Sequence, residues 1–464
     1  PFEWEKAFPE VFTSGAKGGF DAVIGNPPYI RIQAMKEWAA NEVHFLKTNY
    51  FSANKGNYDI YVVFIERGIT LLHPNGQLGF IVPSKYFVTN YGENIRKIIS
   101  QNKLLRKIID FGAIQIFKQA STYTSLLFLS GTRQDNFLYS KIKDINSLQE
   151  SKFIQVKQFM ENDLWSIFDN RKKEIFNKLK KNSKPLEKLP TQISRGSSSG
   201  NDKIFILKKI NGSYISKKGE EVEIEPGLLR IPIHATDFHR YEFEPKYDKA
   251  IIFPYNVDHF SYELISEETL KMNFPKTYSY LFSHKRDLEK RKQYKTWFSY
   301  SAPRNLNLHE EAQILVPLLS EQGSFCRFTN DENKYCLMAS GGFSITIDEN
   351  CSMNINYVLG LLNSKLLFWN LKLISNVFRG GWITCTKQYV KTLPIHIIDF
   401  TNHNETKNHD LIVTLVEHML ELHKRTPQTP FEQEQLEREI AATDAQIDCL
   451  VYNLYGLTDE EIKI

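Results

Sequence analysis

Apolar and polar positions along the first part of the chain follow a pattern typical of strands that alternate with helices. Phe20–Gly25 is a short, mostly apolar run, which predicts a buried strand. Tyr58–Leu72 has apolar residues three and four positions apart, as an amphipathic helix does, and Leu78–Pro83 is a second strand-like run. The same criteria predict a turn at His73–Gly76, a helix at Asn94–Gln101, and strands at Leu104–Phe111 and Thr122–Leu129. This alternation predicts an α/β fold with a parallel, doubly wound sheet.

The chain changes character near residue 185, where a polar stretch rich in glycine and serine follows. Strand-like runs lie at Lys203–Leu207, Ala250–Phe253, Gln313–Leu318, Tyr335–Met338 and Phe343–Ile347, and a helical stretch lies at Asn356–Leu373. Leu411–Leu422 and Glu432–Tyr452 have helical spacing and predict a helical hairpin that packs on the preceding domain. We therefore expect an α/β domain over residues 1–150, a helical connector over 151–187, a mixed α+β domain over 188–400 and a helical segment over 401–464.

The first predicted strand ends in the tetrapeptide Asn26-Pro27-Pro28-Tyr29. Ligands of open α/β sheets bind outside the carboxyl ends of the strands, so this loop lies where a site is expected. Two consecutive prolines fix φ and donate no backbone N–H, which leaves carbonyl oxygens next to a side-chain amide and an aromatic ring. Such a loop can accept hydrogen bonds from a planar amino group and stack on the ring that carries it. A plain strand-to-turn junction is the alternative interpretation.

The tetrapeptide after a strand resembles the catalytic motif of Taq-type, gamma-order DNA methyltransferases, which use S-adenosylmethionine to methylate the 6-amino group of adenine. The resemblance implies that the side-chain oxygen of Asn26 and the carbonyl of Pro27 accept hydrogen bonds from that amino group. The amino nitrogen is a poor nucleophile because its lone pair is delocalised, and two acceptors favour a more tetrahedral nitrogen with an available lone pair. The ring of Tyr29 then stacks on the base, which has to leave the duplex to be reached.

The same resemblance assigns roles to three further residues. Phe64 occupies the place of an aromatic that touches the adenine of the cofactor, and Pro28 belongs both to the catalytic loop and to the cofactor contacts. Phe117, before the last strand, occupies the place of a phenylalanine that stacks on the flipped base. Packing in the core is the alternative for Phe64, because an aromatic on the apolar face of a helix usually lies there.

The later part of the chain resembles the target-recognition domain that follows the catalytic domain in these enzymes and in fused type IIG restriction–modification proteins. The stretches that carry this resemblance are Ile193–Gly196, Leu229–Ile233, Ile252–Tyr255 and Thr386–Ile397. It implies a partial Rossmann-like methyltransferase sheet, a mixed α+β target-recognition domain and a C-terminal helical segment. The residues expected to contact DNA are Arg195, Ser197, Arg230, His234, Lys285, Arg286, Arg291, Lys295, Arg304 and Arg379.

The net charge and the distribution of charged residues indicate which kinds of partner the chain could bind. The 464 residues carry a net charge of +4, which by itself is too small to indicate nucleic-acid binding. Basic residues gather at Arg171–Lys184 and at Lys285–Lys295, where the aromatics of Trp297–Tyr300 follow, and acidic residues prevail after Glu405. Solvated helix faces explain most such runs. Basic clusters beside aromatics also fit a central groove for double-stranded DNA.

Composition argues against several other classes of protein. The five cysteines are scattered without paired spacing, which argues against a disulfide framework or a zinc site. We expect no metal site in this chain, and Mg²⁺ only if a nuclease domain lies upstream. No apolar run reaches membrane-spanning length, and no signal peptide is visible. We therefore expect a cytoplasmic protein of bacterial or archaeal origin, without a membrane partner.

Part of the expected cofactor site is missing from the sequence. The family needs an earlier strand whose glycine-rich turn holds the methionine of S-adenosylmethionine, and no such unit precedes Asn26. The strand before Asn26 is apolar along its length, as expected for a strand with neighbours on both sides. We therefore expect that the main cofactor-binding motif is absent, that a missing N-terminal half or other restriction–modification subunits are partners, and that the fragment alone is inactive and exposes an apolar edge.

Together these features predict S-adenosylmethionine-dependent methylation of the 6-amino group of adenine in a specific double-stranded DNA sequence, within a restriction–modification system. Two alternatives stay open. Protein glutamine methyltransferases share the Asn-Pro-Pro-Tyr loop, although they lack a long recognition domain after it. A sequence-specific DNA-binding module without activity is the other alternative, because the chain lacks the cofactor half.

Overall fold

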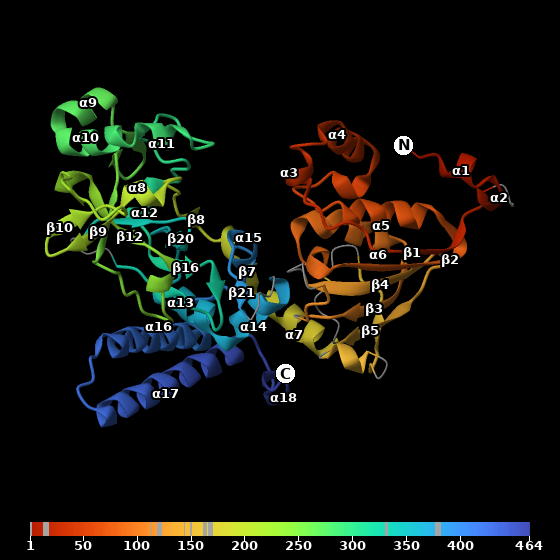
Figure 1. Ribbon diagram of the computed structural model, residues 1–464. Helices are drawn as coiled ribbons and strands as arrows, with labels where there is room; N and C mark the ends of the chain where they lie inside the picture. Colours follow the sequence, from red (N-terminus) through yellow and green to blue (C-terminus); the bar gives the residue numbers. More distant parts are fainter. Residues whose placement is uncertain are drawn as a thin grey trace. The chain divides into compact units, whose positions relative to one another are not determined.

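The computed structural model describes residues 2–12, 18–112, 114–117, 123–142, 144–148, 151–160, 165, 170–329, 333–375 and 382–464. The chain divides into two compact units (Figure 1). The first unit comprises residues 1–174 and 373–380, and the second comprises residues 175–372 and 381–464. Each unit encloses a hydrophobic core of its own.

A mixed sheet forms the centre of the first unit, with the strand order β1-β2-β4-β3-β5-β6. Its strands are β1 (Phe20–Gly25), β2 (Leu72–Pro83), β3 (Leu105–Asp110), β4 (Thr124–Ser130), β5 (Asn136–Lys141) and β6 (Ile154–Lys157). β1 and β2 are parallel, as are β3 and β5, whereas the other neighbours are antiparallel. The expectation of a parallel sheet is therefore correct for only part of it. Parallel neighbours need a crossover, which a helix between β1 and β2 provides.

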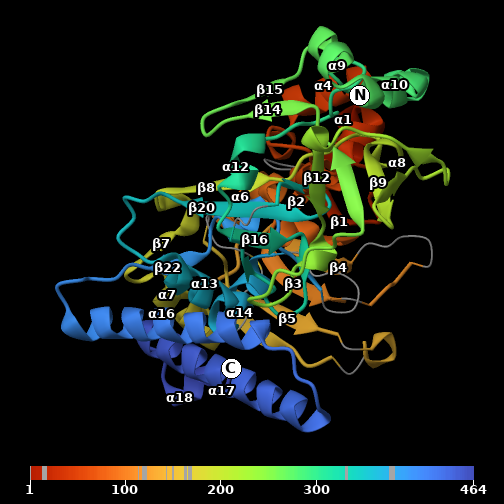
Figure 2. The same ribbon diagram turned by 90° about the vertical axis from the view of Figure 1, so that its left-hand side faces the viewer.

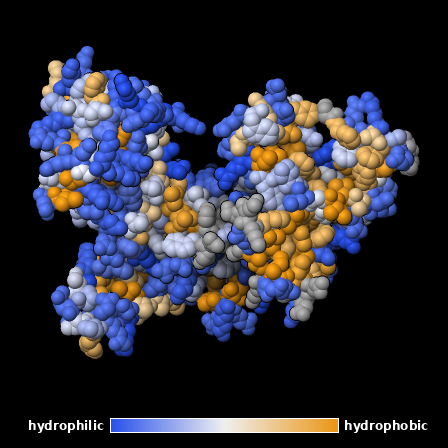
Figure 3. All heavy atoms as spheres, in the orientation of Figure 1, coloured by the Kyte–Doolittle hydropathy of each residue, from blue (hydrophilic) through white to orange (hydrophobic). Residues whose placement is uncertain are grey.

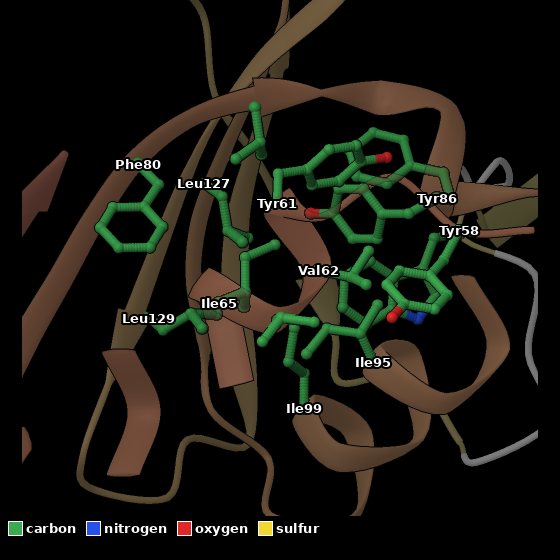
Figure 4. Packing of buried hydrophobic residues seen from close by; sticks show 14 of the residues in the cluster. Tyr58, Tyr61, Val62, Ile65, Phe80, Tyr86, Ile95, Ile99, Leu127 and Leu129 are labelled. Carbon is green, nitrogen blue, oxygen red and sulfur yellow. The ribbon is translucent and has the colours of Figure 1, made fainter. Parts of the chain in front are cut away.

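That crossover helix is α5 (Tyr61–Thr70), and it packs with α6 (Glu93–Gln101) against the sheet. Figure 4 shows Val62 and Ile65 of α5 and Ile95 of α6 in one cluster with Leu127 of β4. Gly68 permits the close approach, because a Cβ at this position would lie 2.5 Å from Leu78 Cδ1. The other helices of this unit are α1 (Trp4–Ala7), α2 (Pro9–Phe12), α3 (Ile32–Met35) and α4 (Ala40–Asn49), and α7 (Asn170–Lys180) continues into the second unit.

The predicted turn at His73–Gly76 is wrong, because these residues belong to β2. The pairing of β1 with β2 is irregular at this point: Phe20 faces Leu72, and the next partner of Ala22 is Gln77. The turn-forming residues are therefore absorbed as a bulge in one long strand rather than as a break between two elements.

The second unit contains two larger sheets, of orders β11-β10-β9-β13-β12-β19 and β18-β16-β20-β8. β12 and β19 are parallel, and the other neighbours in these sheets are antiparallel. Their strands are β8 (Thr191–Arg195), β9 (Ile206–Ile210), β10 (Ser213–Ile215), β11 (Glu221–Val222), β12 (Leu229–Ile233), β13 (Lys249–Ile252), β16 (Ile314–Pro317), β18 (Cys326–Arg327), β19 (Tyr335–Leu337) and β20 (Gly342–Ile347). The described residues of this unit also form three two-stranded sheets. These are β7 (Ser183–Pro185) with β22 (Pro394–His396), β14 (Tyr255–Val257) with β15 (Tyr262–Leu264), and β17 (Leu319–Ser320) with β21 (Ile383–Thr384).

Two sequence predictions fail in detail within this unit. The predicted strand Lys203–Leu207 is a short helix followed by the start of β9, because Ile204 and Phe205 donate backbone hydrogen bonds to Asn201 in a helical turn. The predicted helix Asn356–Leu373 is interrupted at Ser364, whose hydroxyl accepts from the Leu367 N–H. The helices are α8 (Asp202–Phe205), α9 (Glu267–Asn273), α10 (Pro275–Ser283), α11 (Lys285–Glu289), α12 (Leu306–Glu310), α13 (Ile355–Asn363), α14 (Lys365–Ile374), α15 (Lys387–Val390), α16 (His403–Lys424), α17 (Pro430–Leu454) and α18 (Asp459–Ile462).

The predicted helical hairpin at the end of the chain is confirmed. Helices α16 and α17 lie side by side (Figure 2), and α16 packs on α13. A Cβ at Gly360 of α13 would lie 2.8 Å from Ile412 Cγ2 and 3.0 Å from Val416 Cγ2, so a glycine is needed at this contact. Among the helices of the described ranges, none is both long and apolar enough to cross a membrane.

Candidate active site and nucleic-acid interface

The tetrapeptide Asn26–Tyr29 begins directly after the last residue of β1. Asn26 and Pro28 are exposed, Pro27 is buried, and Tyr29 is half-buried. β1 lies at the edge of the sheet, where Ile24 is 85% exposed. The loop is thus anchored through Pro27 and presents Asn26 and Pro28 to solvent.

The hydrogen-bond acceptors of this loop are free. In the described parts of the chain, neither the Asn26 side chain nor the Pro27 carbonyl has a hydrogen-bond partner. The backbone that follows is held firmly, because the Ile60 N–H donates to the Ile30 carbonyl at 2.9 Å and the Ile32 N–H donates to the Tyr58 carbonyl at 2.9 Å. A fixed loop with two unengaged acceptors is suited to bind a donor group such as an amine.

The ring of Tyr29 is held from several sides. Its hydroxyl donates to the Ile81 carbonyl of β2 at 3.2 Å. The Tyr61 ring meets it edge-on, with ring centroids 6.4 Å apart, and burial raises the pKa of Tyr29 to about 12. Tyr29 is therefore a neutral phenol whose aromatic ring is positioned before any ligand arrives.

Phe117 lies next to this tyrosine. The two rings are 6.2 Å apart between centroids, with an interplanar angle of 64°. Phe117 is half-buried, and its carbonyl accepts from Gln115 Nε2 at 3.2 Å. The structure therefore brings together two aromatics that are far apart in the sequence and that the sequence assigned to one base-binding site.

Phe64 is not a core residue. The side chains of Val62, Val63 and Ile65 on the same helix are buried, whereas Phe64 is 45% exposed. Figure 3 shows that apolar residues also gather on the surface of the first unit. An exposed aromatic among buried neighbours is available for a ligand with an aromatic ring.

Apart from Arg379, the residues expected to contact DNA belong to the second unit, where they differ in exposure. Arg195, Arg286 and Lys295 are exposed, and His234, Lys285, Arg291 and Arg304 are half-buried. Ser197 and Arg230 are buried, at 0% and 8% exposure. Arg379 lies outside the described residues.

Two of these arginines are occupied by the protein itself. Arg230 forms an ion pair with Glu310 and stacks on the Phe253 ring, with Cζ 3.7 Å from the centroid. Arg291 donates to the carbonyls of Ser199 and Ser299, each at 2.7 Å. Because these guanidinium groups serve internal contacts, we do not retain Arg230 and Arg291 among the proposed DNA contacts.

Comparisons with known proteins match two segments of the chain, one in each half, to families of restriction–modification proteins. Residues 1–117 match the model of the Eco57I restriction-modification methylase family, and residues 266–395 match that of the TaqI-like C-terminal specificity domain. The Type II restriction enzyme and methyltransferase RM.Eco57I of Escherichia coli is 28% identical over 478 residues, which cover 96% of this chain and 47% of that protein. The Type II methyltransferase M.HindII of Haemophilus influenzae is 27% identical over 451 residues, which cover 90% of this chain and 82% of that protein.

Over most of its length the chain is similar to restriction–modification DNA methyltransferases, and two of its segments match family models of such enzymes. It joins an Eco57I-type methylase segment to a TaqI-like specificity domain, so the family resemblance found in the sequence is confirmed. The chain spans about half the length of RM.Eco57I. The solved structure of the Type IIL restriction-modification enzyme MmeI in complex with DNA has a TM-score of 0.62 at 12% identity, over 95% of this chain and 55% of that chain, which shows a shared fold.

A methyltransferase of this family uses S-adenosylmethionine, and the residues present fit part of that molecule. Phe64 offers an exposed ring, and Pro28 is an exposed residue of the catalytic loop. Both belong to elements that flank the same strand, since the loop follows β1 and α5 is the crossover to β2. The family resemblance assigns both residues to cofactor contacts.

Two residues that support the Asn26–Tyr29 loop, Tyr61 and Ile81, were not predicted from the sequence. Tyr61 reads as a core position of a helix by its spacing, and it is indeed buried. Ile81 acts through its backbone carbonyl, which any residue supplies. A tyrosine three positions before Phe64, at a helix start, was the single available signal.

Proposed function

We propose that this chain carries the catalytic loop for methylation of the 6-amino group of adenine in a specific double-stranded DNA sequence, as part of a restriction–modification system. The observation that carries the proposal is the loop at the end of β1, where two free acceptors precede a fixed tyrosine ring that lies beside Phe117.

The Asn26 side-chain oxygen and the Pro27 carbonyl each accept a hydrogen bond from the adenine amino group. These bonds shift electron density towards the nitrogen and orient its lone pair. As the nitrogen lone pair bonds to the methyl carbon, the methyl–sulfur bond of the donor would break and S-adenosylhomocysteine would leave, so the nitrogen gains a positive charge that it loses with one of its protons. Two fixed oxygen dipoles stabilise that charge more than they stabilise the neutral amine. This difference accelerates the step.

Tyr29 and Phe117 hold the base outside the duplex. Base–aromatic stacking is worth about 1–3 kcal/mol per base, and the flipped state also costs a few kcal/mol of unstacking. The hydroxyl of Tyr29, bound to the Ile81 carbonyl, keeps its ring in place. S-adenosylmethionine supplies the methyl group when bound, and we assign Phe64 and Pro28 to its contacts.

The second unit supplies the contacts to duplex DNA. Lys285 lies over the rings of Trp297 and Phe282, with Nζ 5.2 Å and 5.6 Å from the centroids. Arg286 and Lys295 are exposed on the same segment. The match to a specificity domain over residues 266–395 supports DNA rather than a protein glutamine as the substrate.

A methylation assay with the intact protein tests the proposal. Duplex DNA of random sequence and labelled S-adenosylmethionine are incubated with the protein, and the labelled nucleoside is identified by mass spectrometry. We expect 6-methyladenine within a single DNA recognition sequence. Label on cytosine, or label on a protein glutamine in a mixed extract, would overturn the assignment.

A further inference from the structure

Two loops far apart in the sequence are joined edge to edge in the second unit. One segment comprises residues 194–199, which include the end of β8, and the other comprises residues 301–305, before α12; together they are called the double loop below. Ser198 and Ala302 exchange two backbone hydrogen bonds of 3.0 Å. The Ser301 N–H also donates to the Ser199 carbonyl at 3.2 Å. The double loop is therefore a small antiparallel structure rather than two independent turns.

Side chains lock the double loop further. The buried hydroxyl of Ser197 accepts from the Arg304 N–H at 2.9 Å, and Asn305 Nδ2 donates to Ser194 Oγ at 3.2 Å. A Cβ at Gly196 would lie 2.1 Å from the Met338 carbonyl oxygen, so a glycine is required there. Arg291 supports the structure from within through its bond to the Ser199 carbonyl. This architecture leaves little freedom in the backbone of Arg195 and Arg304, two arginines of the double loop that were expected to contact DNA.

Arg195 and Arg304 lie on the two paired segments of the double loop and carry like charges. One guanidinium N–H of Arg304 donates to the Gly196 carbonyl at 3.1 Å, directly after Arg195 in the chain. Burial and the positive charge of Arg195 lower the pKa of Arg304. Within the described residues neither arginine has an acidic partner. Two adjacent cations on a rigid support repel each other unless an anion binds to both.

We propose that Arg195 and Arg304 form a clamp for a backbone phosphate of duplex DNA. The inference rests on the proposed function, because it takes DNA as the anion that the second unit meets. Guanidinium groups bind phosphate oxygens in bidentate geometry, and a phosphate between two arginines relieves their repulsion. Contacts of this kind fix the register of a protein on DNA without reading its sequence. The clamp therefore positions the DNA, and sequence discrimination comes from other residues.

The salt dependence of DNA binding tests the clamp. Binding of the intact protein to target and non-target duplexes is titrated by fluorescence anisotropy between about 50 and 300 mM salt, a range over which counterion release dominates the change. Each of Arg195→Gln and Arg304→Gln should lower the magnitude of the slope of log K against log salt by about 0.9. The loss of affinity should be the same on both duplexes. Arg195→Lys and Arg304→Lys, which keep the charge, should retain most of the slope.

Arg438→Gln is the matched control, because Arg438 is an exposed arginine on α17 that pairs with Glu434. Its slope should equal that of the unchanged protein. Arg304 also holds the Gly196 carbonyl, so the decisive variant is Arg195→Gln, whose side chain makes no hydrogen bond among the described residues. An unchanged slope in Arg195→Gln, or a loss confined to one target base pair, would overturn the clamp. Absence of salt-dependent DNA binding by the unchanged protein would instead overturn the proposed function.

Discussion

The two candidate contact surfaces of the molecule are built in opposite ways. The catalytic loop of the first unit is a continuous tetrapeptide whose free acceptors and aromatic ring are neighbours in the sequence. The double loop of the second unit joins two segments far apart in the sequence through backbone hydrogen bonds. The groups assigned to the chemistry are thus encoded locally, whereas the proposed grip on DNA depends on tertiary structure.

The catalytic loop and the double loop also differ in how exposed the residues around them are. The catalytic loop follows an edge strand with an 85% exposed Ile24, and Phe64 in the same unit is also exposed. The double loop is itself largely packed into the protein, since its residues Ser194, Ser197 and Ser199 are buried. Substitutions in the first site should therefore change the reaction more than the fold, and substitutions beneath the second should change the fold as well.

The largest effect is expected for Asn26→Ala. Loss of one hydrogen bond that stabilises the transition state typically lowers kcat by about 10²–10³-fold. DNA affinity should stay within a factor of two, because the loop is not among the proposed phosphate contacts. The measurement is single-turnover methylation together with anisotropy. Asn136→Ala, an exposed asparagine on β5, is the control and should leave both unchanged. Normal turnover in Asn26→Ala would remove the loop from the mechanism.

Acid should weaken the second unit through His309. Burial lowers the pKa of this histidine to about 4, below its ordinary value near 6.5. The unfolded chain then binds more protons between these pH values, so the free energy of unfolding falls as pH falls from about 6.5 to about 4, by up to about 3 kcal/mol for this group. Denaturant unfolding followed across this pH range should show a shallower pH dependence in His309→Leu. His403→Leu, at an exposed histidine, should behave like the unchanged protein; equal pH dependence in all three would contradict the prediction.

A smaller effect is expected for Phe117→Ala. The variant loses one stacking partner of the flipped base, worth about 1–3 kcal/mol. A 2-aminopurine at the target position should show less fluorescence change on binding, and turnover should fall accordingly. Phe45→Ala, which removes a partly exposed ring on α4, serves for comparison. If both variants retain the full signal, Phe117 packs on Tyr29 without serving the base.

The smallest effect is expected for Tyr29→Phe. The aromatic ring stays, while the hydrogen bond to the Ile81 carbonyl is lost, which typically costs about 0.5–1.5 kcal/mol. Turnover should fall less than tenfold, and Tyr29→Ala should fall much further. A Tyr29→Phe variant as slow as Tyr29→Ala would mean that the hydroxyl, rather than the ring, carries the function.

The elements with strong local signals were predictable from the sequence. Helix α6, strand β3 and the terminal hairpin were all expected near their observed bounds, because their apolar spacing is regular. The strand at Leu78–Pro83 was placed correctly but proved longer, since a bulge opposite Phe20 absorbs turn-forming residues that local chemistry assigns to a break. The interruption of the predicted helix at Ser364 likewise depends on a capping bond that spacing does not reveal.

The candidate site residues also include some that the local sequence identifies and some whose role depends on tertiary structure. Asn26–Tyr29 could be found because the groups needed for the chemistry are consecutive. The proximity of Phe117 to Tyr29 was expected from the family resemblance alone. Arg230 and Arg195 look equally suitable for DNA in the sequence, yet one is buried against Phe253 and the other is exposed. Burial of a basic residue depends on distant partners, which a single sequence does not specify.

The most direct test of the central claim is the identity of the methylated atom. The intact protein and its Asn26→Ala variant are given labelled S-adenosylmethionine and duplex DNA, and the products are digested to nucleosides and separated by mass. The account predicts 6-methyladenine with the unchanged protein and a loss of about 10²–10³-fold with the variant. Methyl transfer to any other atom, or equal yields of 6-methyladenine from both proteins, would contradict it.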